Sequence, residues 1–198
     1  MNKLLIFLSL FFLRCSPTDS GIKSIEIMSY RYTSPTNTIG LQVKPLLYAK
    51  IYESGDVQME KDNGKLVYYA FSIEEDYLNN IENDTKNTSV DRYQKNLDAV
   101  KLCVCDYPVI RVKIDYKNGK TLSFNFDEND SSEKFKSSRY LFKELTRKSK
   151  SHDNRVRKIK SIVDKRKEFV NFTMNKDTLE LPLPVRPNKK VDIKFTKP

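Results

Sequence analysis

Glycine is scarce in this chain, and three of its five glycines stand between short apolar runs that alternate with polar residues. Gly55, Gly64 and Gly119 each follow a polar residue, and glycine tolerates the positive φ that tight turns require. The runs on either side of each glycine therefore predict β-hairpins. Hairpins pair their strands antiparallel, which limits the fold to classes that contain such a sheet.

The hairpins lead into a segment with helical periodicity, and this order occurs twice. In the first pass, strands at 45–53, 57–61 and 65–72 precede a helix at 73–83. Ser72 is expected to cap that helix, because a glutamate follows it three residues later in the spacing of a capping box. The apolar residues that the helical spacing places on one face are Ile73, Tyr77, Leu78 and Ile81.

The second pass has strands at 108–116 and 120–126, and the first of them carries Arg111, Lys113 and Asp115 at alternate positions. Successive side chains of a strand point to opposite faces, so this spacing predicts one polar face. A second helix is expected after residue 132. Its inward residues are predicted to be Phe135, Leu141, Phe142 and Leu145.

A third helix is predicted at 155–170, and the prolines of the tail at 174–198 favour an extended arm. An additional strand at 22–30 precedes both passes. The order of these elements predicts an α+β fold, with a mostly antiparallel sheet built from β-hairpins and two to three helices packed on it. We expect one domain over 22–198, with a basic helical segment at 131–170. The third helix is expected to bury Val156, Ile159, Ile162, Val163, Phe169 and Val170 on one side.

The N-terminus has the pattern of an export signal. Lys3 precedes an apolar run at 4–13, whose helical length of about 15 Å is half the thickness of a bilayer core. The run is therefore too short to span a membrane and fits the apolar region of a signal peptide. Cys15 closes this segment, and small or polar residues follow it at 16–20.

This arrangement resembles bacterial lipoproteins, in which a cysteine at the end of the signal peptide is acylated and begins the mature protein. The resemblance implies a signal peptide at 1–14, lipid attachment at Cys15, a tether at 15–21 and a membrane as partner. Lipoproteins usually have a small residue where this chain has Arg14. One alternative is simple secretion with cleavage after Ser20, which leaves a soluble periplasmic or secreted protein. The other is an N-terminal segment that stays uncleaved and anchors the chain.

The pattern of strand, turn glycine, strand and helix is also similar to small Bacteroidota-type lipoprotein domains. Its second occurrence includes the stretch "DYPVIRVKIDYKNGK". Since those domains have no assigned activity, this resemblance implies a fold and no mechanism.

The formal net charge of +10 is concentrated in one segment. Between Lys143 and Glu168 there are eleven basic and four acidic residues. Cations on an amphipathic helix can contact an anionic lipid or polysaccharide surface, and the alternative is an ordinary solvated helix face. Few aromatic residues that could stack on bases lie there, and an exported location argues against nucleic acid. The predicted contact residues are Arg155, Arg157, Lys158, Lys160, Lys165, Arg166 and Lys167.

Cys103 and Cys105 are the two other cysteines, in the stretch "LCVCDYP". In an extended strand their Cα atoms are about 6.5–7 Å apart, at the upper limit for a disulfide. Three interpretations stay open: two buried small residues, a structural disulfide, or a redox or metal-binding pair.

Motifs of common enzyme classes are missing from the sequence. There is no phosphate-binding glycine cluster, no G-x-S-x-G and no H-E-x-x-H, and His152 stands in a polar connector. The acidic clusters at 72–77 and 126–132 fit the N-terminal ends of helices. We therefore expect no catalytic residue, no metal and no cofactor.

The sequence thus predicts an exported envelope protein with a non-catalytic binding or scaffold role, and a protein in the envelope is one candidate partner. Two alternatives stay open. One is an immunity-type lipoprotein that captures a toxin. The other is a periplasmic thiol–disulfide protein that uses Cys103 and Cys105.

Overall fold

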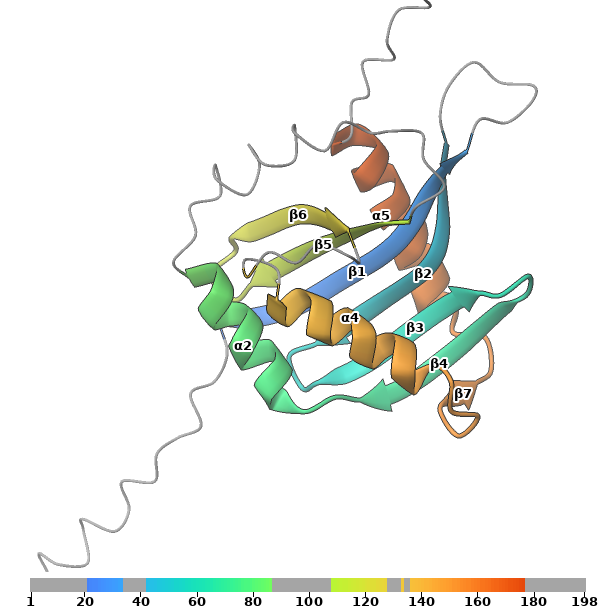
Figure 1. Cartoon of the computed structure of the whole chain (residues 1–198), viewed down its shortest axis with the longest axis horizontal. Coiled ribbons are helices and arrows are strands. Elements are labelled where there is room, and N and C mark those ends of the chain that lie inside the picture. Colours follow the sequence, from blue (N-terminus) through green and yellow to red (C-terminus); the bar gives the residue numbers. More distant parts are fainter. Residues whose placement is uncertain (1–20, 34–41, 87–107, 128–132, 134–135, 177–198) are drawn as a thin grey trace, which may run out of the picture.

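The computed structural model describes residues 21–33, 42–86, 108–127, 133 and 136–176. Within them, seven strands form one antiparallel sheet in the order β6-β5-β1-β2-β3-β4-β7, with three helices beside it (Figure 1). The predicted α+β fold is therefore confirmed. The strands are β1 (Ile22–Thr33), β2 (Gln42–Tyr52), β3 (Asp56–Asp62), β4 (Leu66–Ser72), β5 (Val109–Tyr116), β6 (Thr121–Asp127) and β7 (Arg155–Val156). The helices are α2 (Glu75–Lys86), α4 (Lys136–Lys148) and α5 (Lys160–Lys176).

The three predicted hairpins are present, and their turn glycines all have φ between 81° and 83°. Gly55 is required for a second reason, because a Cβ atom there would lie 2.7 Å from the carbonyl oxygen of Ile73. Ile73 N donates a hydrogen bond of 3.0 Å to Gly55 O, which ties the end of β4 to the β2–β3 turn.

This tie explains why the predicted cap of α2 is wrong. Ser72 is the last residue of β4, and its hydroxyl donates to Asp56 Oδ1 at 2.9 Å. The helix begins later, at Glu75, with Glu75 and Asp76 in its first turn. Their negative charges interact favourably with the positive end of the helix dipole, as the sequence predicts.

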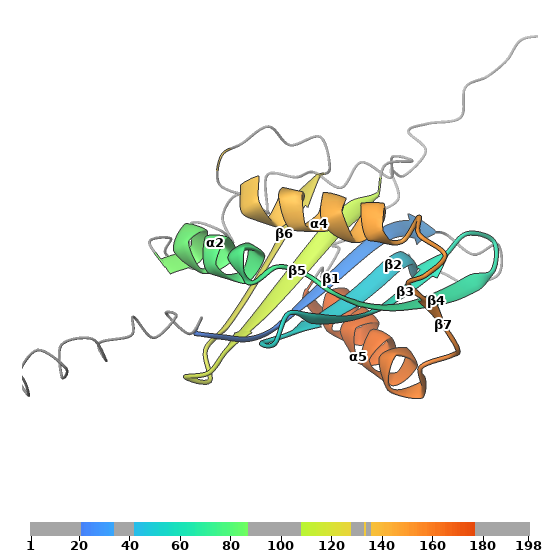
Figure 2. The same cartoon turned by 90° about the horizontal axis from the view of Figure 1, so that it is seen from below.

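The two faces of the sheet are covered differently. Figure 2 shows α2 and α4 on one face and α5 on the other. The core beneath α2 and α4 contains aliphatic and aromatic side chains from β1 to β6. The predicted inward residues Leu141, Phe142 and Leu145 are buried there, and Phe135 lies outside the described residues.

The core beneath α5 is smaller and richer in tyrosine. Its buried members are Met28, Tyr30, Val43, Tyr48, Tyr68, Ile162 and Phe169. Ile159, Val163 and Val170 are partly buried against it, so the predicted apolar side of this helix is largely correct.

The predicted start of the third helix is wrong. Arg155 and Val156 form β7, which pairs with Tyr69 and Tyr68 of β4, and α5 begins only at Lys160. The open edge of β4 supplies backbone partners that the helical pattern does not reveal, and Val156 is 40% exposed. At its other end α5 continues to Lys176, past the predicted boundary of the arm at 174. The remainder of that arm lies outside the described residues.

Candidate functional site

The strand register brings opposite charges together on the sheet face beneath α5. Glu26 of β1 stands opposite Lys50 of β2 on one side and opposite Lys113 of β5 on the other. Residues directly opposite in adjacent strands share a face, so the register places one carboxylate between two ammonium groups. We call Glu26, Lys50, Lys113 and the nearby Asp115 the charged row.

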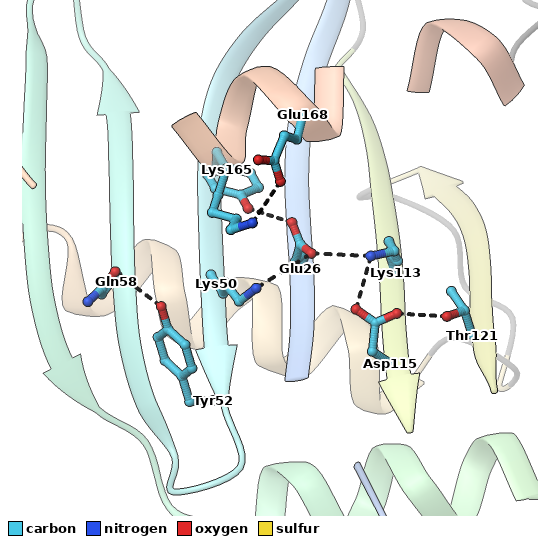
Figure 3. A network of polar contacts seen from close by, with 10 residues as sticks. Glu26, Lys50, Tyr52, Gln58, Lys113, Asp115, Thr121, Lys165 and Glu168 are labelled. Carbon is cyan, nitrogen blue, oxygen red and sulfur yellow. Dashed lines mark hydrogen bonds and ion pairs between the residues drawn. The ribbon is translucent and has the colours of Figure 1, made fainter. Parts of the chain in front are cut away.

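Glu26 is the centre of this row, and its side chain is buried. Its Oε1 atom lies 3.3 Å from Lys113 Nζ and 3.8 Å from Lys50 Nζ (Figure 3). Its Oε2 atom accepts a hydrogen bond of 2.5 Å from the hydroxyl of Tyr48. Both oxygens of a buried carboxylate are therefore satisfied, as burial of a charge requires.

Lys113 extends the row to Asp115, with Nζ 2.9 Å from Oδ2. Thr121 donates a second hydrogen bond, of 2.8 Å, to Oδ1 of Asp115. Burial by itself raises the pKa of Asp115, but the hydrogen bonds from Lys113 and Thr121 outweigh it and lower that pKa. Burial by itself lowers the pKa of Lys113, and its bonds to Asp115 and Glu26 reverse that effect and raise the pKa.

Helix α5 adds a further balanced pair above the row. Lys165 Nζ lies 2.8 Å from Glu168 Oε2, and Figure 3 shows both side chains over Glu26. Burial raises the pKa of the Tyr48 hydroxyl far above its ordinary value, and the negative charges of Glu26 and Glu168 add to this effect. Tyr48 therefore stays protonated and remains a donor to Glu26.

A second buried contact fastens α5 to the sheet. Arg166 Nε lies 3.1 Å from Oε1 of Glu60, although the N–H group is not aligned for a hydrogen bond. The other oxygen of Glu60 has no hydrogen-bond donor among the described residues. Burial raises the pKa of Glu60, and the positive charges of Arg166 and Lys158 only partly oppose this effect.

The charged row is suited to holding α5 and setting the register. It contains two carboxylates and two ammonium groups, all of which have partners, so it offers no uncompensated charge to a ligand. Within the described ranges, no group of three or more His, Cys, Asp or Glu side chains is placed to hold a metal ion.

The connection between α4 and α5 differs from the charged row, because its charges are mostly of one sign. Residues 150–160 contain five cations and one carboxylate, a net charge of +4. We call these cations the basic edge, and all of them are exposed. In the part of the chain that the structure describes, none of the five forms an ion pair. They are Lys150, Arg155, Arg157, Lys158 and Lys160.

Backbone contacts hold the basic edge against the sheet. Asn154 O accepts a hydrogen bond of 3.0 Å from Ala70 N, and its side-chain amide donates to Lys148 O at 2.9 Å. Arg155 N donates to His152 O at 3.0 Å, which closes the turn before β7. The cations are therefore displayed on an ordered part of the molecule.

The predicted contact residues divide into two groups. Arg155, Arg157, Lys158, Lys160 and Lys167 are exposed. Lys165 is paired with Glu168, and Arg166 faces Glu60 of the sheet. The inward position of Arg166 could have been predicted from helical spacing, because Arg166 follows the buried Ile162 by four residues and so lies on the same face of the helix.

The remaining predicted site residues are the three cysteines. Cys15, Cys103 and Cys105 lie outside the described residues, as does the signal peptide at 1–14. Of the predicted tether, Gly21 is described: its amide donates to Glu82 Oε2 at 2.9 Å, which fixes the start of β1 to α2.

Sequence reasoning missed the centre of the charged row. Glu26 stands between Ile25 and Ile27 in a strand, and Lys50 and Tyr48 occupy polar positions of β2. Alternation places Glu26 on the face opposite to these isoleucines, and the sequence does not show that α5 covers that face. The partners of Glu26 become evident only from the order of the strands.

Comparison of the sequence with protein-family models and with curated proteins finds no match. Among the described helices, none is both long enough and apolar enough to cross a membrane.

Proposed function

We propose that this chain is an exported envelope protein that is attached to a membrane by a lipid on Cys15 and binds an anionic surface without catalysis. The basic edge is the binding surface in this proposal. The apolar run at 4–13 and the cysteine that follows it support the location.

The observation that carries the binding role is the unpaired charge of the basic edge. Three exposed cations elsewhere on the helices each have a carboxylate beside them: Lys136 pairs with Glu133, Arg147 with Glu144 and Lys165 with Glu168. A cluster with a net charge of +4 and no such partner attracts anions most strongly at low ionic strength.

The attachment is tested by the intact mass of the full-length chain purified from its membrane fraction, beside Cys15→Ser. We expect a mass that corresponds to a chain starting at Cys15 plus acyl groups, and its loss in the variant. An unmodified chain that starts near Gly21 would instead indicate simple secretion and contradict the lipid anchor.

The binding role is tested with two variants that remove the same number of charges. Arg155→Gln/Arg157→Gln/Lys158→Gln neutralises the basic edge, and Lys136→Gln/Arg147→Gln/Lys165→Gln neutralises paired cations. The probe is a set of vesicles with and without phosphatidylglycerol. We expect the first variant to lose about fivefold in affinity for each cation removed and the second to lose little. Equal losses would attribute binding to net charge and contradict a specific surface.

A further inference from the structure

Two exposed apolar side chains lie beside the basic edge. Large apolar side chains exposed in the described residues are Leu66, Tyr140, Val156 and Met174. Leu66 is 47% exposed and begins β4, while Val156 is 40% exposed and ends β7. Single exposed apolar residues need no explanation, but these two come from neighbouring strands.

The register places the two side chains together. Val156 stands opposite Tyr68, and Leu66 precedes Tyr68 by two residues, so all three are on the same face of the sheet. Diagonal neighbours of this kind are about 7 Å apart. Tyr68 is buried beneath α5, whereas Leu66 and Val156 project at the margin of the sheet. We call Leu66 and Val156 the apolar pair.

Cations adjoin the apolar pair on the same short segment. Arg155 precedes Val156, and Arg157 and Lys158 follow it. Each of these cations is exposed and forms no ion pair within the described residues. Apolar side chains beside several cations are the combination that binds the interface of an anionic membrane, where both headgroups and acyl chains are within reach.

We propose that the β4–β7 edge docks on an anionic phospholipid bilayer, with the apolar pair entering the headgroup region. Arg155, Arg157 and Lys158 contact lipid phosphates in this arrangement. The inference rests on the membrane location proposed above and deepens it, because it names the lipid surface and the part of the fold that meets it. A soluble polysaccharide would use the cations and leave the apolar pair in water.

The test uses tryptophan as a reporter, since the chain contains none. The full-length chain carrying Val156→Trp is reconstituted with vesicles whose acyl chains are brominated and quench tryptophan on contact. Tyr140→Trp is the matched control, because Tyr140 is exposed on α4, over the opposite face of the sheet.

We expect emission from the Val156→Trp chain to shift to the blue and to be quenched in vesicles that contain phosphatidylglycerol. Vesicles of phosphatidylcholine alone should quench it far less, and the Tyr140→Trp chain should stay unquenched in both. Adding Arg155→Gln, Arg157→Gln and Lys158→Gln to the reporter should weaken docking about fivefold per cation, and high salt should do the same. Equal quenching of the two reporters, or equal quenching in both lipids, would overturn the proposal, as would an unquenched Val156→Trp.

The two proposals fail separately. The reporter reads the position of the β4–β7 edge, and the intact mass reads the modification of Cys15. An acylated chain in which Val156→Trp is unquenched would support the lipid anchor and contradict docking of the β4–β7 edge. An unmodified chain in which Val156→Trp is quenched would contradict the lipid anchor and support the edge as a membrane contact.

Discussion

The charged row and the basic edge both gather ionised side chains, and they differ in what surrounds each charge. In the charged row, Glu26 lies between two ammonium groups and accepts a hydrogen bond from Tyr48. In the basic edge, five exposed cations share a short segment with one carboxylate. A compensated buried charge makes the fold sensitive to the loss of either partner, whereas uncompensated exposed charge contributes to association.

Removing the central carboxylate should have the largest effect on stability. Glu26→Gln leaves Lys50 without its carboxylate and Lys113 with Asp115 alone, which should lower the free energy of unfolding by about 3 kcal/mol. Urea denaturation measures this loss. Glu53→Gln is the matched control, because Glu53 pairs with Lys117 at the surface and should lose less than about 1 kcal/mol. Equal effects of the two variants would remove the contrast between buried and exposed pairs.

The hydroxyl of Tyr48 should have the next largest effect. Tyr48→Phe deletes a buried donor to a charged acceptor and should cost about 2 kcal/mol in the same assay. Tyr52→Phe provides the comparison, because its hydroxyl makes a longer, partly buried bond of 3.3 Å to Gln58. A smaller loss for Tyr48 than for Tyr52 would mean that Glu26 does not depend on this hydroxyl.

The contribution of Asp115, at the outer end of the charged row, to the free energy of unfolding should depend on pH. The pKa of Asp115 is lowered, so its contribution is present above the ordinary aspartate pKa and is lost as the pH falls through the lowered value. Asp115→Asn should therefore be less stable than wild type by about 1 kcal/mol at neutral pH, because Lys113 and Asp115 are partly exposed.

That difference should close as the pH falls below about 4. Urea denaturation across this range provides the measurement, and Asp153→Asn, at an exposed turn, should follow wild type throughout. A difference that stays constant down to acid pH would show that the charge of Asp115 is not what stabilises the fold.

The basic edge should show the smallest effect on stability. Arg155→Gln/Arg157→Gln removes two exposed cations that have no ion-pair partner in the described residues, so the free energy of unfolding should change by less than about 0.5 kcal/mol. Thermal denaturation, measured beside the vesicle assay, should show that the variant loses binding and keeps its stability. A loss above about 1 kcal/mol would instead assign these arginines to the fold.

The contrast also explains how much could be predicted from the sequence. Turn glycines and alternation are local signals, so the hairpins around Gly55, Gly64 and Gly119 follow from a few residues each. The capping error at Ser72 and the error at Val156 have one cause: a neighbouring strand or turn supplied backbone partners that no local pattern contains. Tertiary hydrogen bonds decided both boundaries.

The basic edge could be predicted from the sequence, whereas the charged row could not. The basic edge is contiguous in sequence, so counting charges between Lys143 and Glu168 locates it. The charged row joins Glu26 and Lys113, which are 87 positions apart, and depends on β5 lying beside β1. The polar face of β5 is evident from its alternation, but nothing local assigns Glu26 to it.

The place of β1 has a consequence for how the chain folds. This strand comes first in the sequence and third in the sheet, between β5 and β2. A chain that emerges from its N-terminus can pair β1 with β2, β2 with β3 and β3 with β4 through short loops, while the other edge of β1 stays open until β5 arrives. Closing so long a loop slows folding and prolongs the exposure of an apolar edge. The kinetic bottleneck should therefore lie at the β1–β5 pairing, and a chain halted before residue 109 would be the form most prone to aggregate.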